Sequence, residues 1–293
     1  MRILVTGDTG FIGSHMKEFL LRKGIEVKGY SRRGGFDVLN RKQLQDAAKG
    51  CDFIYHFAAE AKPGPSVLRP VHTIMVNLRG SLNVLEVCKE HGISLVYPSS
   101  CEIYGDSKQP ITEDHPLFPP NPYAASKAAI DRLCYMYYKC YGVDVKIVRL
   151  FNPYGPRQQL NKIIPTFYFS AIKNKPLTVY GDGTDMRDFV YVGDIIRGLW
   201  KARKLPPGEA VNIATGKGTT NLEVAKLILK MVKSDAEIRF VDYPKAFGGI
   251  RWQIGSNKKA RELIGWKPRV KLEDGIKLTI KWLETLSGGR EVG

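Results

Sequence analysis

The sequence predicts an α/β protein: a doubly wound, mainly parallel sheet with a smaller C-terminal α/β lobe. Over the first half of the chain, short apolar segments alternate with longer helical segments, which is the order of βαβ units with right-handed crossovers. A glycine-rich turn at 7–13 separates the first apolar segment from the first helix. After Asn152 this regularity is lost, because prolines divide the chain into shorter pieces.

The elements of the first half are expected in a regular order. Residues 2–6 (RILVT) form a short apolar run that ends at a glycine, which is typical of a buried strand. The helix after it is expected from Ser14 to about Arg22, since the glycine-rich turn opens it. By the same alternation we expect further strands at 25–30, 53–57, 94–98 and 144–150, and further helices at 41–48, 77–90 and 123–141.

Composition excludes several classes of protein. No apolar run among the 293 residues approaches the roughly 18 that cross a bilayer, and the N-terminus reaches a glycine too early for a signal peptide. The five cysteines are odd in number and form no C-x-x-C pair, so we expect a reduced, cytoplasmic protein. The five histidines lack the short spacings that build a metal site, and we expect none.

The chain is strongly basic, with 45 Lys and Arg against 29 Asp and Glu and a formal net charge of +16. Its basic residues stand singly or in pairs, such as Arg32-Arg33, without a block of the kind that forms a nucleic-acid-binding arm. We therefore expect a small anionic molecule as the partner, and neither a nucleic acid nor a membrane.

The turn after the first strand has the spacing G-x-x-G-x-x-G, a variant of the dinucleotide-binding fingerprint. Glycines allow a tight turn and a close approach of the backbone to a pyrophosphate, and the helix N-terminus presents N–H groups to the phosphates. We therefore assign to a dinucleotide cofactor the residues Gly7, Gly10, Phe11, Ile12 and Gly13.

These motifs suggest two lobes. Residues 1–160 are expected to form an NAD(P)-binding Rossmann-type domain, to which the chain returns around 188–215. Residues 161–293, with a second helical region at 221–233, are expected to form the substrate-binding lobe. No low-complexity linker separates the two, so we expect them to share an interface and a cleft.

The residues after the second expected strand bear on the choice of cofactor. About 20 residues past the glycines a carboxylate takes the ribose hydroxyls of NAD, whereas arginine suits the extra phosphate of NADP. This chain has Ser31, Arg32 and Arg33 there and no acid, which favours NADP; two solvated surface arginines are the alternative. Asp37, followed by Val38, is a candidate for the adenine amine or, alternatively, the N-cap of the next helix.

Four polar residues are candidates for catalysis. Tyr123 and Lys127 are four apart at a helix start, so both lie on one face of that helix. A lysine ammonium beside a phenol lowers the pKa of the phenol towards the range of a general base. Ser100 and Glu102 directly follow a predicted strand, at the edge where such a sheet places ligands.

Further ordered motifs extend over nearly the whole chain. They lie at 56–59 (HFAA), 100–105, 123–127, 149–157, 181–183, 187–192, 211–214 and 265–268. Together with the glycine turn they resemble the extended short-chain dehydrogenase/reductases, specifically the nucleotide-sugar epimerase/dehydratase group. The resemblance implies that Phe57, Ala58 and Ala59 line the cofactor site.

The resemblance also implies roles for the candidate catalytic residues. Tyr123 would take the proton of the sugar C4 hydroxyl as hydride leaves C4 for the nicotinamide. Lys127 would hold the nicotinamide ribose and lower the pKa of the tyrosine, and Ser100 would hydrogen-bond the developing C4 oxygen.

The same resemblance implies contacts to substrate and to a second subunit. Asn152, Arg187 and Arg251 match positions that contact the diphosphate of a nucleotide-diphosphate sugar, and guanidinium groups suit diphosphate as bidentate donors. The helices at 77–90 and 123–141 would pair with their copies in a homodimer.

The reaction after C4 oxidation is left open between 4-epimerisation and 4,6-dehydration. Glu102 stands where related dehydratases carry the carboxylate that removes the C5 proton, although a structural carboxylate is an equal alternative; Cys101 stands where thymidine-type dehydratases carry Asp. An NADPH-dependent reductase of a nucleotide-linked 4-keto sugar is the second hypothesis. A non-catalytic dinucleotide-sensing protein is a third, and the retention of Ser100, Tyr123 and Lys127 argues against it.

Overall fold

A six-stranded parallel sheet organises the N-terminal part of the protein. The computed structural model describes residues 1–243 and 250–287. The sheet has the order β10-β5-β4-β3-β1-β2, so strands are added on both sides of β1, and the predicted doubly wound α/β fold is confirmed. Its strands are β1 (Arg2–Thr6), β2 (Glu26–Tyr30), β3 (Phe53–His56), β4 (Ser94–Ser100), β5 (Val145–Leu150) and β10 (Ala210–Ile213).

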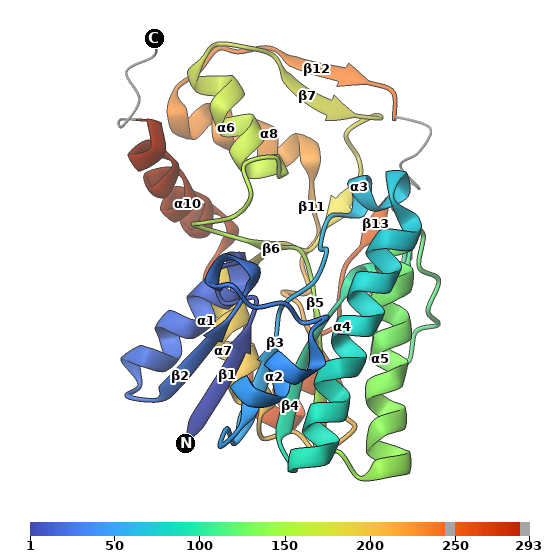
Figure 1. Ribbon diagram of the computed structural model, residues 1–293. Coiled ribbons are helices and arrows are strands. Elements are labelled where there is room, and N and C mark those ends of the chain that lie inside the picture. The colour runs from blue at the N-terminus through green and yellow to red at the C-terminus, as the bar shows by residue number, and fades with distance from the viewer. Residues whose placement is uncertain (244–249, 288–293) are drawn as a thin grey trace.

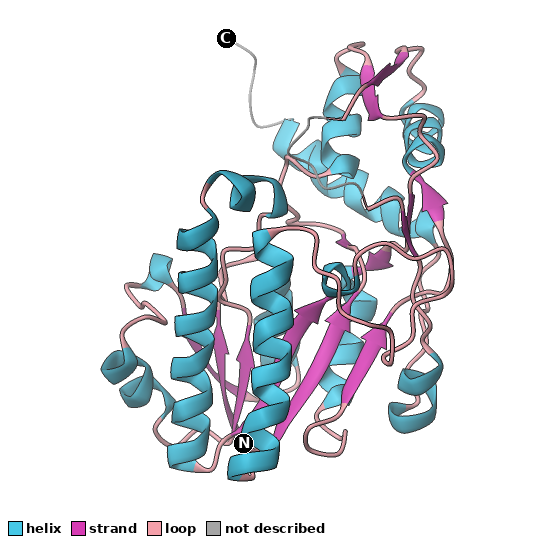
Figure 2. Ribbon diagram, turned by 90° about the vertical axis from the view of Figure 1, so that its right-hand side faces the viewer, coloured by secondary structure: helices cyan, strands magenta, loops and turns pink. Residues whose placement is uncertain are grey.

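Helices cover both faces of this sheet (Figures 1 and 2). Side chains of β1 alternate between two hydrophobic cores, with Ile3 and Val5 in one and Leu4 in the other, because successive strand residues point to opposite faces. The first core is completed by α1 (Phe11–Arg22) and α7 (Val192–Ala202). The second is completed by α2 (Arg41–Ala48), α4 (Pro70–His91) and α5 (Pro122–Tyr141).

Helices α1 and α4 begin earlier than the sequence-based expectation, α1 at Phe11 and not at Ser14. Helix α4 begins at Pro70, ahead of the expected start at Asn77, and a short helix α3 (Pro63–Leu68) precedes it. A proline suits the first position of a helix, because its missing N–H would have no partner there and its φ is already helical. The prolines of this segment therefore start helices and do not interrupt one.

Elements from the second half of the chain also pack on the sheet. Strand β10 is the edge strand beside β5, and α9 (Lys258–Ile264) and Trp266 extend the first core. We propose the division into a domain of residues 1–160, joined again around 188–215, and a lobe of residues 161–293. Within that lobe, the α9 segment packs on the sheet domain, and 244–249 and 288–293 lie outside the described residues.

The C-terminal lobe has a hydrophobic core of its own, built from α6, α8 and α10 (Figure 1). These helices are α6 (Ile163–Ile172), α8 (Asn221–Val232) and α10 (Leu272–Ser287). Short strands join the helices: β6 (Pro153–Tyr154) with β9 (Val190–Tyr191), β7 (Leu177–Tyr180) with β12 (Ile238–Val241), and β8 (Met186–Arg187) between β11 (Thr219–Thr220) and β13 (Trp252–Gln253).

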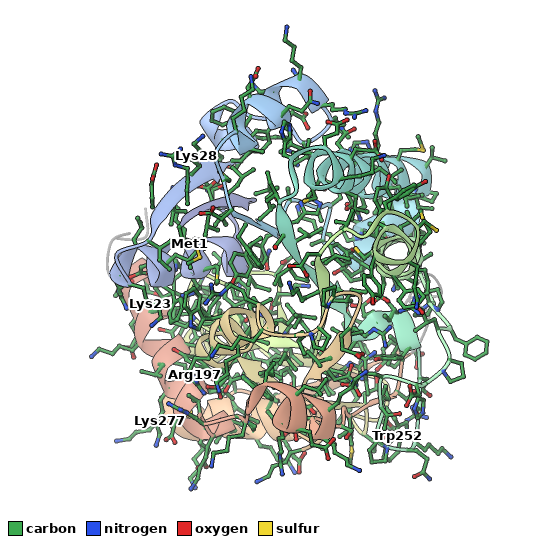
Figure 3. All side chains as sticks on the ribbon, turned by 90° about the horizontal axis from the view of Figure 1, so that it is seen from below. Met1, Lys23, Lys28, Arg197, Trp252 and Lys277 are labelled. Atoms are coloured by element: carbon green, nitrogen blue, oxygen red, sulfur yellow. The ribbon has the colours of Figure 1, made fainter. Side chains whose placement is uncertain are left out.

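The basic side chains labelled in Figure 3 lie on separate elements. Lys28 is on β2, Lys23 follows α1, Arg197 is on α7 and Lys277 is on α10.

Within the described residues, none of the helices combines the length and apolar character that crossing a bilayer requires.

Candidate active site

A cleft of about 330 Å³ opens at the carboxyl ends of β1, β4 and β5, where the C-terminal lobe faces the sheet. Of the residues singled out from the sequence, its lining contains Gly7, Gly10, Phe11, Ile12, Gly13, Phe57, Ala59, Ser100, Glu102, Tyr123, Lys127 and Asn152. Those outside the lining are Ser31, Arg32, Arg33, Asp37, Val38, Ala58, Arg187 and Arg251. Residues far apart in the sequence thus meet at the edge where parallel sheets bind ligands.

The glycine turn is a cradle that side chains would fill. Gly7 has φ +69°, and a Cβ there would lie 2.8 Å from the backbone of Phe57 and Ala58. A Cβ on Gly13 would lie 2.2 Å from the carbonyl oxygen of Gly7. Gly10 is the N-cap of α1 and has no side chain to satisfy its first N–H groups. This geometry fits the pyrophosphate of a dinucleotide.

The residues expected to select the cofactor lie beside the cleft. Arg32 donates a hydrogen bond to Glu60 at 2.7 Å and lines a second hollow of about 370 Å³. Arg33 is exposed on the turn after β2. The Asp37 carboxylate accepts from the backbone N–H of Leu39 at 2.9 Å, whereas the N-cap of α2 is Asn40. The N-cap alternative for Asp37 is therefore wrong, because Asn40 stands directly before the helix.

Hydrogen bonds and packing hold the backbone in place at Ser31, Val38 and Ala58, which lie outside the lining of the cleft. Val38 packs in the second core, and its carbonyl accepts from Asn83 at 2.8 Å. Ser31 is buried and is the N-cap of a short 3₁₀ turn. The N–H of Ala58 donates to the Thr6 hydroxyl at 3.2 Å.

Three candidate catalytic groups converge because one strand ends where one helix begins. Ser100 is the last residue of β4, and Tyr123 is in the first turn of α5. The Ser100 hydroxyl is hydrogen-bonded to the Tyr123 phenol. Lys127, one turn further along α5, donates to the carbonyl oxygen of Pro98 at 2.5 Å.

The pKa of the Tyr123 phenol is above its ordinary value. Burial is the main cause, the negative charge of Glu102 adds to it, and the Ser100 hydrogen bond lowers the pKa. The Lys127 ammonium lies 4.1 Å from the centre of the Tyr97 ring, and burial lowers its pKa to about 7. In the protein alone Lys127 therefore faces Pro98 and Tyr97, and the expected lowering of the tyrosine pKa needs a bridging group such as a ribose.

Glu102 faces the cleft from the turn after β4. Its backbone N–H donates to the Ser100 hydroxyl at 3.2 Å, and its carboxylate accepts from the amide of Asn121 at 3.0 Å. Burial raises the pKa of Glu102, whereas the Asn121 hydrogen bond and the charges of Lys162 and Arg187 lower it. A partly buried carboxylate so placed can act as a base towards a bound substrate.

The two arginines proposed to bind the substrate diphosphate, Arg187 and Arg251, are already paired with aspartates and backbone carbonyl oxygens. Arg251 donates to Asp182 at 2.8 Å and to Asp185 at 3.3 Å. Hydrogen bonds from the hydroxyl and the backbone N–H of Thr184, together with the one from Arg251, hold the pKa of Asp182 below its usual range. Arg187 donates to the carbonyl oxygen of Ile250 at 2.6 Å and lies 4.0 Å from Asp185. A diphosphate therefore has to compete with aspartates for both guanidinium groups.

Around Asn152, which the sequence motifs had singled out, the structure adds polar groups that they had not. Among the described residues, the buried side-chain atoms Ser99 Oγ, Asn152 Nδ2 and Gln158 Oε1 have no hydrogen-bond partner, and all three residues line the cleft. Buried polar atoms are costly when unpaired, so they indicate a polar ligand. Lys162, directly before α6, brings a cation to the same wall. Only Asn152 carried a sequence signal, because it belongs to an ordered motif.

His56 lies at the floor of the cleft as a neutral, structural side chain. Its Nδ1 pairs with the Thr6 hydroxyl at 2.7 Å and its Nε2 with the Ser81 hydroxyl at 3.0 Å. Burial and the charge of Lys127 lower its pKa to about 3. Within the described part of the chain, no three His, Cys, Asp or Glu side chains gather in a way that could hold a metal ion.

Comparisons with known proteins agree with this geometry. The profile of the NAD dependent epimerase/dehydratase family matches residues 3–214. UDP-glucuronic acid decarboxylase 1 of Danio rerio is 33% identical over 96% of this chain and 72% of its own length. UDP-glucuronate 4-epimerase of Thermodesulfobacterium geofontis is 32% identical over 95% of both chains. The crystal structure of DesIV, a dTDP-glucose 4,6-dehydratase from Streptomyces venezuelae with NAD and TYD bound, superposes with a TM-score of 0.93 at 31% identity, over 99% of each chain.

The fold and the site together define a Rossmann-fold enzyme of the extended short-chain dehydrogenase/reductase type, with a serine, a tyrosine and a lysine at the end of its sheet. The chain belongs to the NAD dependent epimerase/dehydratase family, whose members among its relatives are nucleotide-sugar epimerases, decarboxylases and dehydratases.

Proposed function

We propose that this enzyme oxidises the C4 hydroxyl of a nucleotide-diphosphate sugar and then carries the 4-keto sugar through epimerisation or 4,6-dehydration at the same site. The observation that carries the proposal is the convergence of Ser100, Tyr123, Lys127 and Glu102 on a cleft that also contains the glycine cradle. The relatives catalyse three different outcomes on nucleotide sugars, which a shared 4-keto sugar explains.

Each polar group then has a task set by its position. Tyr123 accepts the proton of the C4 hydroxyl, and Ser100 donates a hydrogen bond to the oxygen as negative charge develops on it. When bound, the nicotinamide cofactor supplies a reversible acceptor for the hydride of C4. Oxidation at C4 acidifies the hydrogen at C5, and Glu102 is the carboxylate in the cleft that can remove it.

Substrate binding draws on the unpaired atoms of the lining. Asn152, Gln158 and Ser99 offer donors and acceptors to sugar hydroxyls or phosphates. Arg187 and Arg251 are proposed for the diphosphate, with Asp182 and Asp185 as the counter-ions that the diphosphate displaces.

The experiment is proton NMR of the purified enzyme with UDP-glucose, UDP-glucuronate and GDP-mannose in deuterated water, with catalytic NADP or NAD and no reductant. A new sugar shows a closed hydride cycle. With UDP-glucose or GDP-mannose, retention of hydrogen at C5 identifies an epimerase, and deuterium at C5 identifies a dehydratase. If all three sugars stay unchanged, the proposal fails, and 4-keto sugars with NADPH test the reductase alternative.

We also propose NADP as the preferred cofactor. The proposal rests on Arg32 and Arg33 after β2, where no carboxylate stands to bind the ribose hydroxyls of NAD. Glu60 is the competitor for this phosphate, because it accepts from Arg32 at 2.7 Å. Its backbone is fixed by Asn77, which accepts from the N–H of Glu60 at 2.7 Å.

Replacing Arg32 and Arg33 together by alanine is expected to weaken NADP binding by roughly tenfold, since hydrogen bonds to charged groups contribute about 1.5–3 kcal/mol. NAD binding should change less than about twofold. Glu60→Gln is the matched variant with the opposite expected effect on NADP affinity. It removes the negative charge that pairs with Arg32, so NADP binding should become tighter. Calorimetric titration with both cofactors measures this, and an equal loss for NAD and NADP contradicts the phosphate contact.

A homodimer through α4 and α5 is the proposed assembly. These helices lie side by side on one flank of the sheet (Figure 2) and leave Val71, Met75 and Tyr135 exposed. Met75→Glu is expected to yield monomers in sedimentation velocity, because a charge in an apolar interface is costly. Leu278→Glu, at a similarly exposed position of α10, is the control and should remain dimeric. A wild-type monomer refutes the proposal.

We propose a reducing compartment, the cytoplasm, as the site of action. All five cysteines are free, and four of them are buried. Burial raises the pKa of the Cys88 and Cys101 thiols, which keeps them protonated and unreactive. Titration of thiols in protein purified without reductant should recover five, and recovery of three or fewer contradicts this.

A further inference from the structure

Asn121 links the two halves of the candidate catalytic machinery. Its side-chain oxygen accepts from the backbone N–H of Ala124 at 2.8 Å, which makes it the N-cap of α5. Its side-chain nitrogen donates to Oε2 of Glu102 at 3.0 Å. The oxygen of the Asn121 amide therefore caps the helix that carries Tyr123, and the nitrogen of the same amide binds the Glu102 carboxylate, which faces the same cleft.

The cap determines which end of the amide meets Glu102. An N-cap side chain must offer an acceptor, because the first N–H groups of a helix have no partner within it. An asparagine has one acceptor end and one donor end. With the oxygen committed to Ala124, the Nδ2 donor is the group left for Glu102, and a donor stabilises the ionised carboxylate over the protonated acid.

We propose that Asn121 is a positioning residue that keeps Glu102 ionised and directed into the cleft. The inference rests on the proposed function only for its catalytic meaning, since the hydrogen bonds exist in the protein without substrate. It explains how a partly buried carboxylate, next to a phenol, remains available as a base.

The other groups around Glu102 come from several elements and do not replace this contact. Lys162 before α6 and Arg187 on β8 lower the pKa of Glu102 by their charges at a distance. The Tyr123 phenol and the Cys101 thiol are neutral at physiological pH, because burial raises the pKa of both. Burial of Glu102 itself acts in the opposite direction to the cations. Asn121 supplies the side-chain hydrogen bond to the Glu102 carboxylate.

Asn121→Ser separates the two functions of the side chain. Serine is as good an N-cap as asparagine, but it is too short to donate to Glu102 while capping. The pKa of Glu102 is expected to rise by about one unit, and Asn121→Asp, which keeps the cap and adds a negative charge, should raise it further. The matched control is Asn40→Ser at the N-cap of α2, where the side chain accepts from Gln43 at 3.1 Å.

The pKa is measured by carbon NMR titration of carboxyl-labelled protein, with the Glu102 signal assigned by its loss in Glu102→Gln. Melting temperatures of Asn121→Ser and Asn40→Ser should agree within a few degrees, which shows that the cap survives. An unchanged Glu102 pKa in both Asn121 variants overturns the inference. In turnover, the pH at which C5 exchange reaches half its maximum should shift upward by the same amount in Asn121→Ser.

Failure of the inference is distinguishable from failure of the proposed function. The titration needs no substrate, so it decides the role of Asn121 even if none of the nucleotide sugars reacts. If the sugars react and the titration shows no shift, the function stands and the inference falls. If the titration shifts and no sugar reacts, the inference stands and the proposed function falls.

Discussion

Tyr123→Phe is expected to lower turnover by about a thousandfold, within the range that general acid–base groups contribute. Phenylalanine keeps the ring and its packing and removes only the hydroxyl that is hydrogen-bonded to Ser100. No other phenol among the described residues lines the cleft. Binding of NADP or NAD should stay within about twofold of the wild type, because the glycine cradle is untouched.

The pH dependence follows from the same phenol. Burial holds the pKa of Tyr123 above its ordinary value, so the hydroxyl is protonated in the protein alone at neutral pH. A base must lose that proton before it acts, so kcat/KM should rise towards alkaline pH. Lys127, with a pKa lowered to about 7, gains charge when anionic phosphates bind nearby and then favours the phenolate.

The control for this variant is Tyr191→Phe. Tyr191 is a partly buried tyrosine on β9 that does not line the cleft. It should retain nearly full activity, and its melting temperature gives the cost of losing a hydroxyl elsewhere. If Tyr123→Phe turns over as fast as Tyr191→Phe, Tyr123 is not the base, and the assignment of the Ser100–Tyr123–Lys127 group fails.

The sequence was most informative where local rules decide the structure. The run 2–6 and the glycines after it gave the first strand and turn, because an apolar run and the space around Gly7 and Gly13 admit few alternatives. The start of α4 was misjudged, since Pro70 stands at a position where proline starts a helix and does not break it. The parallel, doubly wound sheet followed from the alternation of strands and helices, whereas the order of its strands comes from the structure.

The contacts that tune the site could not be predicted, because they join side chains across sequence gaps. The Arg32–Glu60 and Asn121–Glu102 contacts depend on how loops after different strands settle. The ion pair between Arg251 and Asp182 likewise depends on the pairing of β13 with β8. A motif identifies the residue type at a position, and only the fold determines its partner.

Glu102→Gln is expected to abolish deuterium incorporation at C5 and, with it, any dehydration. Glutamine has nearly the same shape and can still pair with Asn121, but it cannot accept a proton. Loss of a base contributes a factor of about a hundred to ten thousand, so residual exchange should be at the level of the solvent reaction. Oxidation at C4 would use Ser100, Tyr123, Lys127 and the nicotinamide as hydride acceptor, and it does not involve Glu102. The 4-keto sugar should therefore still form in single-turnover experiments.

The matched control is Glu113→Gln. Burial raises the pKa of Glu113 as it does that of Glu102, but Glu113 accepts from the backbone of Asn212 and does not line the cleft. Each variant removes one partly buried carboxylate, so a difference in activity between the two variants reports whether the carboxylate faces the cleft. Glu113→Gln should keep at least half of the wild-type exchange rate.

Stability gives an independent measure of the same carboxylate. The folded-state pKa of Glu102 is raised above its unfolded value, so ionisation disfavours the folded state, and the wild type loses stability as pH rises from the unfolded pKa to the folded one. Glutamine carries no such penalty, so Glu102→Gln should melt at or above the wild-type temperature at neutral pH while C5 exchange is lost. A variant that is both stable and fully active in C5 exchange removes Glu102 from the mechanism, and a stable variant that converts sugar with hydrogen retained at C5 identifies an epimerase in which Tyr123 alone is the base.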